Sequence, residues 1–203
     1  MENYEIKMSE RESLALITMM INKAKGRVNE TGTLYLLWGW LILVCCIVQF
    51  IGSYFLNYAN SYYIWFSTWL LLIYQFFYIG RRKKIHKTKT YMGEINGFVW
   101  LVFFISMMLV IFIGSYLKKY EIINPLLLML YGMPTFLSGI ILKFKPLIVG
   151  GISCWILSVI SVFIYVDFQL MLIAIAVISG WIIPGYILKQ NFKKETQKNG
   201  VLN

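Results

Sequence analysis

Six long apolar segments, none of which contains an aspartate, glutamate, lysine or arginine, dominate this sequence. A helix needs roughly 20 apolar residues to cross the hydrocarbon core of a bilayer, because each residue advances the helix by about 1.5 Å. Within a bilayer every backbone polar group must be paired internally, and a helix achieves this within one segment. The sequence therefore predicts an all-α polytopic membrane protein with six transmembrane helices at residues 34–55, 62–80, 95–117, 124–142, 147–166 and 168–188.

The almost continuously apolar stretch 124–188 must be divided by argument. Lys143, Lys145 and Pro146 interrupt it once, because two charges and a missing backbone donor suit a membrane surface and not its centre. The part that follows would form a helix about twice as long as the bilayer is thick. Asp167 is the only charged residue near its midpoint, so the second turn is predicted there.

The basic residues are distributed very unevenly between the predicted loops. With a cytoplasmic N-terminus, seventeen of the nineteen basic residues fall on the inner side, and only Lys118 and Lys119 fall outside. Lysine and arginine are enriched in cytoplasmic loops. We therefore expect a multi-pass protein of the cell inner (plasma) membrane with both ends in the cytoplasm.

The two ends of the chain are polar. Residues 1–33 are expected to form a cytoplasmic segment, and residues 189–203 a basic cytoplasmic tail. Within the first, residues 9–25 are predicted to be an amphipathic helix, because Ser9 and Glu12 form a capping-box pattern and apolar residues follow at helical spacing. This helix either lies in the lipid interface, which is the favoured interpretation, or binds a partner or regulator.

The loop between the second and third segments has the densest positive charge. Clustered basic residues beside a span attract anionic surfaces, so this loop is interpreted as a topology determinant that contacts lipid headgroups, although phosphoinositide or nucleic-acid binding is an alternative. No nucleic-acid partner is expected. His86 lies in the same loop with no second metal ligand near it in sequence. The candidate lipid-headgroup contacts are Arg81, Arg82, Lys83, Lys84, Lys87 and Lys89.

Two glutamines lie within the apolar segments. Polar side chains at membrane depth usually hydrogen-bond a neighbouring helix, so Gln49 and Gln75 are candidates for intramembrane hydrogen bonding. They lie in opposite leaflets, about 15 Å apart in depth on the helix rise. Each is therefore expected to have its own partner.

The fourth segment is the most irregular. It carries the candidate kink or polar lining Gly132, Pro134, Ser138 and Gly139. Broken helices of this kind line substrate sites in transporters, whereas in most helical bundles a proline near glycines only shapes the packing. Packing is the favoured interpretation.

Small residues also recur at steps of four on the last two segments, at Gly150, Cys154 and Ser158 and at Ala176, Gly180 and Pro184. Such stripes let helix backbones approach closely, so these segments are predicted to pack as a tight hairpin. A weak similarity between residues 50–55 and 112–117 further suggests three related helical hairpins.

The chemistry that an enzyme requires is sparse. The chain is 59% hydrophobic and 14% charged, against about 25% charged for a soluble domain, and no acidic residue lies at membrane depth. No paired carboxylates, phosphate-binding glycine loop or metal-ligand spacing is present. The sequence thus favours a protein that is not an enzyme and needs no cofactor.

Three motifs, YLLWGW at 35–40, FKPLIVGGISCW at 144–155 and IPGYIL at 183–188, resemble a family of small uncharacterised bacterial six-span integral membrane proteins. The resemblance implies the same architecture and no particular activity. The leading hypothesis is a non-enzymatic accessory, sensing or scaffold subunit that acts through helix packing and a basic cytoplasmic face. Its partners would be membrane lipids with anionic headgroups, and a membrane protein or second copy of the chain. The alternative is a small permease, or its membrane subunit, for an apolar or uncharged solute, and an intramembrane enzyme comes third.

Overall fold

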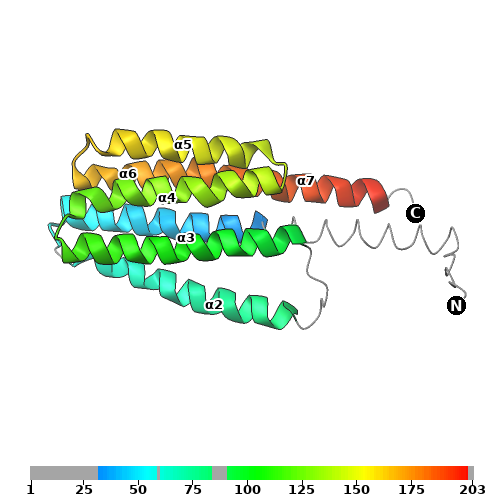
Figure 1. Ribbon diagram of the computed structural model, residues 1–203, viewed down its shortest axis with the longest axis horizontal. Helices are drawn as coiled ribbons and strands as arrows, with labels where there is room; N and C mark the ends of the chain where they lie inside the picture. The colour runs from blue at the N-terminus through cyan, green and yellow to red at the C-terminus, as the bar shows by residue number, and fades with distance from the viewer. Residues whose placement is uncertain (1–31, 59, 84–90, 201–203) are drawn as a thin grey trace, which may run out of the picture.

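The computed structural model describes residues 32–58, 60–83 and 91–200, and these residues form helices and turns without any strand. The helices lie along one common long axis (Figure 1). The predicted all-α class is confirmed for this part of the chain. The amphipathic helix predicted at 9–25 lies outside the described residues. The first helix is Gly32–Phe55, and it is followed by the short helix η2 (Ser61–Trp65), which leads directly into α2 (Phe66–Lys83). The next three helices are α3 (Tyr91–Tyr116), α4 (Tyr120–Ile141) and α5 (Lys145–Ser161). The last helix is continuous and consists of α6 (Val166–Val177), η3 (Ile178–Ile182) and α7 (Ile183–Gly200).

Four helices of the described chain are long and apolar enough to cross a membrane, at Gly32–Phe55, Ile95–Tyr116, Tyr120–Ile141 and Val166–Asn191. This length and composition identify a membrane protein. The apolar helix α5 has 17 residues, and α2 has 18 residues with three basic residues at its end. The bilayer-crossing role of α2 and α5 stays a prediction.

Two turns use lysines in the left-handed backbone region. Lys118 and Lys143 have φ of 55° and 51°, and the residue after each donates its N–H to the carbonyl five residues earlier. These bonds, Lys119 to Gly114 and Phe144 to Gly139, are those of the Schellman motif, which satisfies the last carbonyls of α3 and α4. The break predicted around Lys143 is thus a helix C-terminus.

The turn between α5 and α6 lies at residues 162–165, slightly before the position predicted for it. Asp167 is instead in the first turn of α6. A carboxylate is favourable there because the unpaired N–H groups give the start of a helix a partial positive charge. The acidic residue therefore marks the beginning of a helix and not the centre of the turn.

Gln169 joins three helices near this turn. Its side chain is buried, and its Nε2 donates to the carbonyls of Ser161, Ile164 and Glu121 at 3.0–3.1 Å. Pro125 has no N–H for the carbonyl of Glu121, four residues earlier, and Gln169 supplies the missing donor. Gln169 thereby satisfies a carbonyl at the C-terminal end of α5 and replaces the hydrogen bond that Pro125 removes from α4.

Close helix contacts among α4, α5 and η3 form the packed part of the molecule. A Cβ built on Gly150 would lie 2.6 Å from the Cα of Gly180, and one on Gly151 would lie 2.9 Å from the carbonyl oxygen of Gly132. Only glycine permits backbones to approach so closely. The small-residue stripes predicted on α5 and on the last helix do meet, at Gly150 and Gly180, and α4 packs on the neighbouring face of α5.

The remaining helices are much more exposed. None of the Ile95–Tyr116 window of α3 is buried, compared with 56% of the windows in Tyr120–Ile141 and Val166–Asn191. In Figure 1, α2 diverges from α3 along its length, and α7 extends beyond the other helices. The molecule therefore combines a tightly packed half with a half that presents broad apolar faces.

Candidate functional site

A cluster of buried and partly buried polar and aromatic side chains, contributed by four helices, is the strongest candidate for a functional site. In the part of the chain that the structure describes, no group of histidine, cysteine, aspartate or glutamate could hold a metal ion. The cluster consists instead of hydroxyl, indole and amide groups. Its members are Tyr35 from the Gly32–Phe55 helix, Asn96, Trp100 and Phe103 from α3, Tyr131, Thr135 and Ser138 from α4, and Trp181 from η3.

Trp181 is central to the cluster and lies in the π-helical turn η3, which interrupts the last helix. Such π turns often occur at functional sites, because they rotate the following side chains relative to a regular helix. The buried indole Nε1 of Trp181 donates to the hydroxyl of Thr135 at 2.9 Å, and that hydroxyl donates to the carbonyl of Tyr131 at 2.7 Å. The chain of two bonds links the last helix to α4.

Most of the aromatic ring pairs in the cluster meet edge to face, whereas the Phe103–Tyr131 pair is tilted at 38°. Trp181 packs against Tyr131 with ring centroids 5.2 Å apart and against Trp100 at 5.8 Å, and Trp100 in turn contacts Tyr35 at 5.9 Å. Phe103 reaches Tyr131 at 5.5 Å. Edge-to-face pairs at these separations are favourable because the positive ring edge meets the negative ring face. The rings therefore fix how four helices are rotated relative to one another.

A second polar link joins α3 to α4. The fully buried hydroxyl of Ser138 donates to Oδ1 of Asn96 at 2.7 Å. The hydroxyl of Tyr35 lies close to Ser138 and Trp100, yet no described group forms a hydrogen bond of normal geometry with it. A buried hydroxyl without a partner is costly. This hydroxyl is therefore the buried polar atom of the cluster that its described neighbours leave unsatisfied.

The cluster contains no group that is charged at neutral pH. Its hydroxyl, amide and indole groups form hydrogen bonds that link neighbouring helices.

The two glutamines singled out in the sequence each meet an indole on the opposite helix of the first hairpin. Trp38 Nε1 donates to Gln75 Oε1 at 2.5 Å, and Trp65 Nε1 donates to Gln49 Oε1. Because the two helices run antiparallel, the Trp38–Gln75 pair and the Trp65–Gln49 pair lie at different heights along the hairpin. Gln49 and Gln75 therefore do not contact each other.

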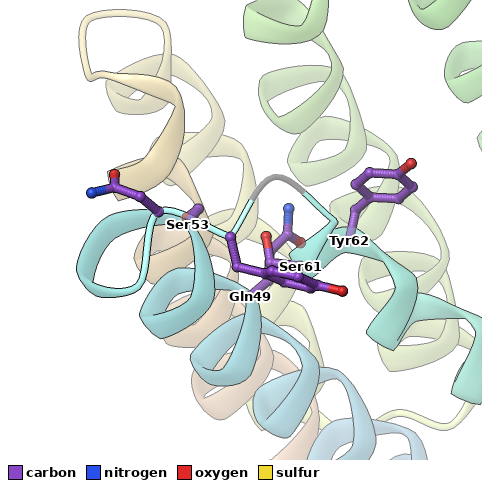
Figure 2. A pocket seen from close by; sticks show the side chains of 6 residues that line it. Gln49, Ser53, Ser61 and Tyr62 are labelled. Carbon is purple, nitrogen blue, oxygen red and sulfur yellow. The ribbon is translucent and has the colours of Figure 1, made fainter.

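A polar recess of about 280 Å³ lies where the first helix turns into η2 (Figure 2). Gly52 makes the sharp approach possible, since a Cβ there would lie 2.7 Å from the Cβ of Ser61. Gln49 and Ser53 lie four residues apart and so share a face of the first helix, and further lining residues come from beyond the turn. The lining residues are Gln49, Ser53, Asn57, Tyr58, Ser61 and Tyr62.

The other residues named from the sequence are dispersed. Gly132 and Gly139 face α5, where a Cβ would collide with Trp155 Nε1 and with the backbone nitrogen of Ile148 respectively. Pro134 is fully buried within an unbroken α4. Arg81, Arg82 and Lys83 end α2, whereas Lys84, Lys87, Lys89 and His86 lie outside the described residues.

Sequence reasoning missed Tyr35, Asn96, Trp100 and Trp181 as members of the cluster. The one available signal was Asn96, a polar amide near the start of a strongly apolar helix. Only the rotations of the helices bring the rings of Tyr35, Trp100 and Trp181 together.

The chain matches no protein-family model, no curated protein sequence and no solved structure. The resemblance noted from its apolar motifs stays a prediction.

Proposed function

We propose that this protein is a six-span protein of the bacterial inner (plasma) membrane that acts as a non-enzymatic accessory, sensing or scaffold subunit. One observation carries the proposal, namely the contrast between the packed half and the exposed half. In α4 and in the last helix, over half of an apolar 18-residue stretch is buried, whereas none of the corresponding stretch of α3 is buried. A helix that is apolar all round and exposed faces lipid or another membrane protein.

The exposed half has a distinctive surface. On α2 and α3 large aromatic side chains point outward, with 80% of Phe76, 66% of Phe77 and 70% of Phe112 accessible. Aromatic side chains dominate the energetics of interfaces, because each removes a large apolar area from its surroundings. We infer that this half is the docking surface, and that the packed half keeps its helices in place.

The proposed topology puts both ends of the chain and the basic loop in the cytoplasm. Reporter fusions after Lys89 and Lys145 should score cytoplasmic, and fusions after Asn57, Lys119 and Ile164 should score external. The reason is the positive-inside distribution of seventeen basic residues against two. A cytoplasmic score at Ile164 would remove the last hairpin from the membrane and contradict the six-span proposal.

The docking role is tested by site-specific photo-crosslinking in native membranes. A photoreactive residue in place of Phe112 on α3 should form a discrete protein adduct, whereas the same residue in place of Val159 on α5 should form lipid adducts only. The two positions are matched, because both side chains are apolar and largely exposed, at 70% and 64%. Lipid adducts alone at both positions would refute the docking surface.

The alternative function, a small permease for an uncharged solute, is favoured by the polar recess in Figure 2, which presents amide and hydroxyl groups without any charge. Against it, Thr135 and Ser138 on the irregular helix are fully buried and bonded to neighbouring groups. Proteoliposomes of the wild-type protein should therefore pass no solute from a broad uncharged panel. Flux that Pro134→Ala abolishes, with the protein still folded, would establish the permease instead.

A further inference from the structure

The surface between α2 and α3 is hollowed into an apolar groove of about 450 Å³. Five of its six lining residues come from α2, and the exposed surface of the lining is almost entirely apolar. Four of the six side chains are aromatic. The groove is lined by Trp69, Leu72, Ile73, Phe76, Phe77 and Phe104.

The groove lies between α2 and α3, which diverge along their length (Figure 1). Trp69 meets Phe104 of α3 edge to face at 6.5 Å, and the Trp38–Gln75 hydrogen bond holds α2 against the first helix. The side chains of Ile73 and Phe77 stay more than half exposed.

The register of α2 leads from the groove to a positively charged end. Residues 69, 73 and 77 follow one another at steps of four, so they share a helix face, and position 81 continues that face by one turn. The helix continues through Arg81, Arg82 and Lys83. The apolar face of α2 therefore runs about 12 Å along the helix rise, and the next turn of the helix contains three successive basic positions.

We propose that this groove holds one acyl chain of an anionic phospholipid, whose phosphate pairs with the basic end of α2. The proposal rests on the cytoplasmic position of that end in the proposed topology. Arginine matches the geometry of phosphate oxygens, and basic sites between helices on the cytoplasmic side bind anionic headgroups. The occupant therefore needs an apolar part that fills the groove and a negative charge at the end of α2 where the basic residues lie.

The lining of the groove argues against a second helix as its occupant. Helices pack closely in membranes where small residues let the backbones approach. The groove contains no glycine, alanine or serine, and its rings stand out from α2. A thin, flexible acyl chain fits between such rings, because it adjusts to their spacing.

The experiment is intact-mass spectrometry of the full-length protein extracted from membranes that contain equal amounts of phosphatidylglycerol and phosphatidylcholine. The wild type should retain one phosphatidylglycerol in clear preference to phosphatidylcholine. Arg81→Gln combined with Arg82→Gln should weaken this retention roughly tenfold, because two charges near the phosphate are lost. Leu72→Trp should weaken the retention similarly by filling the groove. Val159→Trp, at an exposed position of α5, should leave the retention unchanged.

Two results would overturn the proposal. One is equal retention of the two lipids by the wild type, or undiminished retention by the double arginine variant, whose changes lie outside the packed half and do not threaten folding. The other is a dimer of the wild type that Leu72→Trp dissociates, since a second copy would then occupy the groove. Either result leaves the reporter fusions and the Phe112 crosslinks as they are, so failure of the lipid site is distinguishable from failure of the proposed function.

Discussion

Alanine at Gly151 should destabilise the protein, whereas alanine at Gly180 should not, although both are glycines of the same packed half. A Cβ at position 151 would lie 2.8 Å from the backbone nitrogen of Phe136 and 2.9 Å from the carbonyl oxygen of Gly132. A Cβ at position 180 would meet its nearest neighbours, Cys154 Sγ and the carbonyl oxygen of Gly150, at 3.6 Å, which is ordinary contact.

The expected size follows from two opposing effects. Glycine to alanine within a helix gains about 0.5–1 kcal/mol, because the unfolded chain loses conformational freedom. Overpacking costs typically about 1–3 kcal/mol, and position 151 belongs at the upper end because backbone atoms, which do not rotate away, form the contact. Gly151→Ala should therefore lose roughly 2–2.5 kcal/mol, and Gly180→Ala should gain about 0.5–1 kcal/mol.

Thermal unfolding of the purified protein in one detergent measures this difference. With roughly 2–4 °C per kcal/mol for a chain of this size, the two variants should differ by about 5–14 °C in midpoint. Gly97→Ala on α3 is the control for helix propensity, because nothing lies within 4 Å of its added Cβ. Equal midpoints for Gly151→Ala and Gly180→Ala would refute the close-contact explanation.

Three further substitutions test the polar contacts, each by thermal midpoint in detergent unless stated. Gln75→Leu should lose about 0.6–1.7 kcal/mol, and a double-mutant cycle with Trp38→Phe should show that the loss is coupled. Thr135→Val should lose about 1 kcal/mol, because it leaves the buried Trp181 indole without its acceptor, and an unchanged midpoint would mean that the indole finds another partner. Pro134→Ala restores a backbone donor, so the free energy of unfolding should stay unchanged or rise by about 1 kcal/mol. A large fall in the midpoint would show that α4 depends on the proline for its shape.

Helix type and approximate helix limits followed from the sequence, because they depend on properties that are local in the chain. The charged pair around Pro146 ends one apolar run wherever the rest of the protein lies, and residues 142–144 indeed form a turn. The small residues at 150 and 180 likewise indicated a close helix contact, because their spacing along each helix is enough to predict it. The turn near Asp167 was displaced by a few residues, because a carboxylate is also stabilised at a helix N-terminus, a position that charge alone does not distinguish from a turn.

The cluster around Trp181 was decided by the tertiary structure alone. Where a helix is apolar on almost every face, as α3 is, periodicity does not show which face turns inward, so Asn96 is the one sequence signal for the meeting of Tyr35, Trp100 and Trp181. The same holds for the separation of α2 from α3, which creates the groove around Ile73. The sequence by itself determined that these segments are apolar helices and which ends are basic. Their rotations and separations arose from contacts between residues distant in the chain, because only packed side chains can select among faces that are equally apolar.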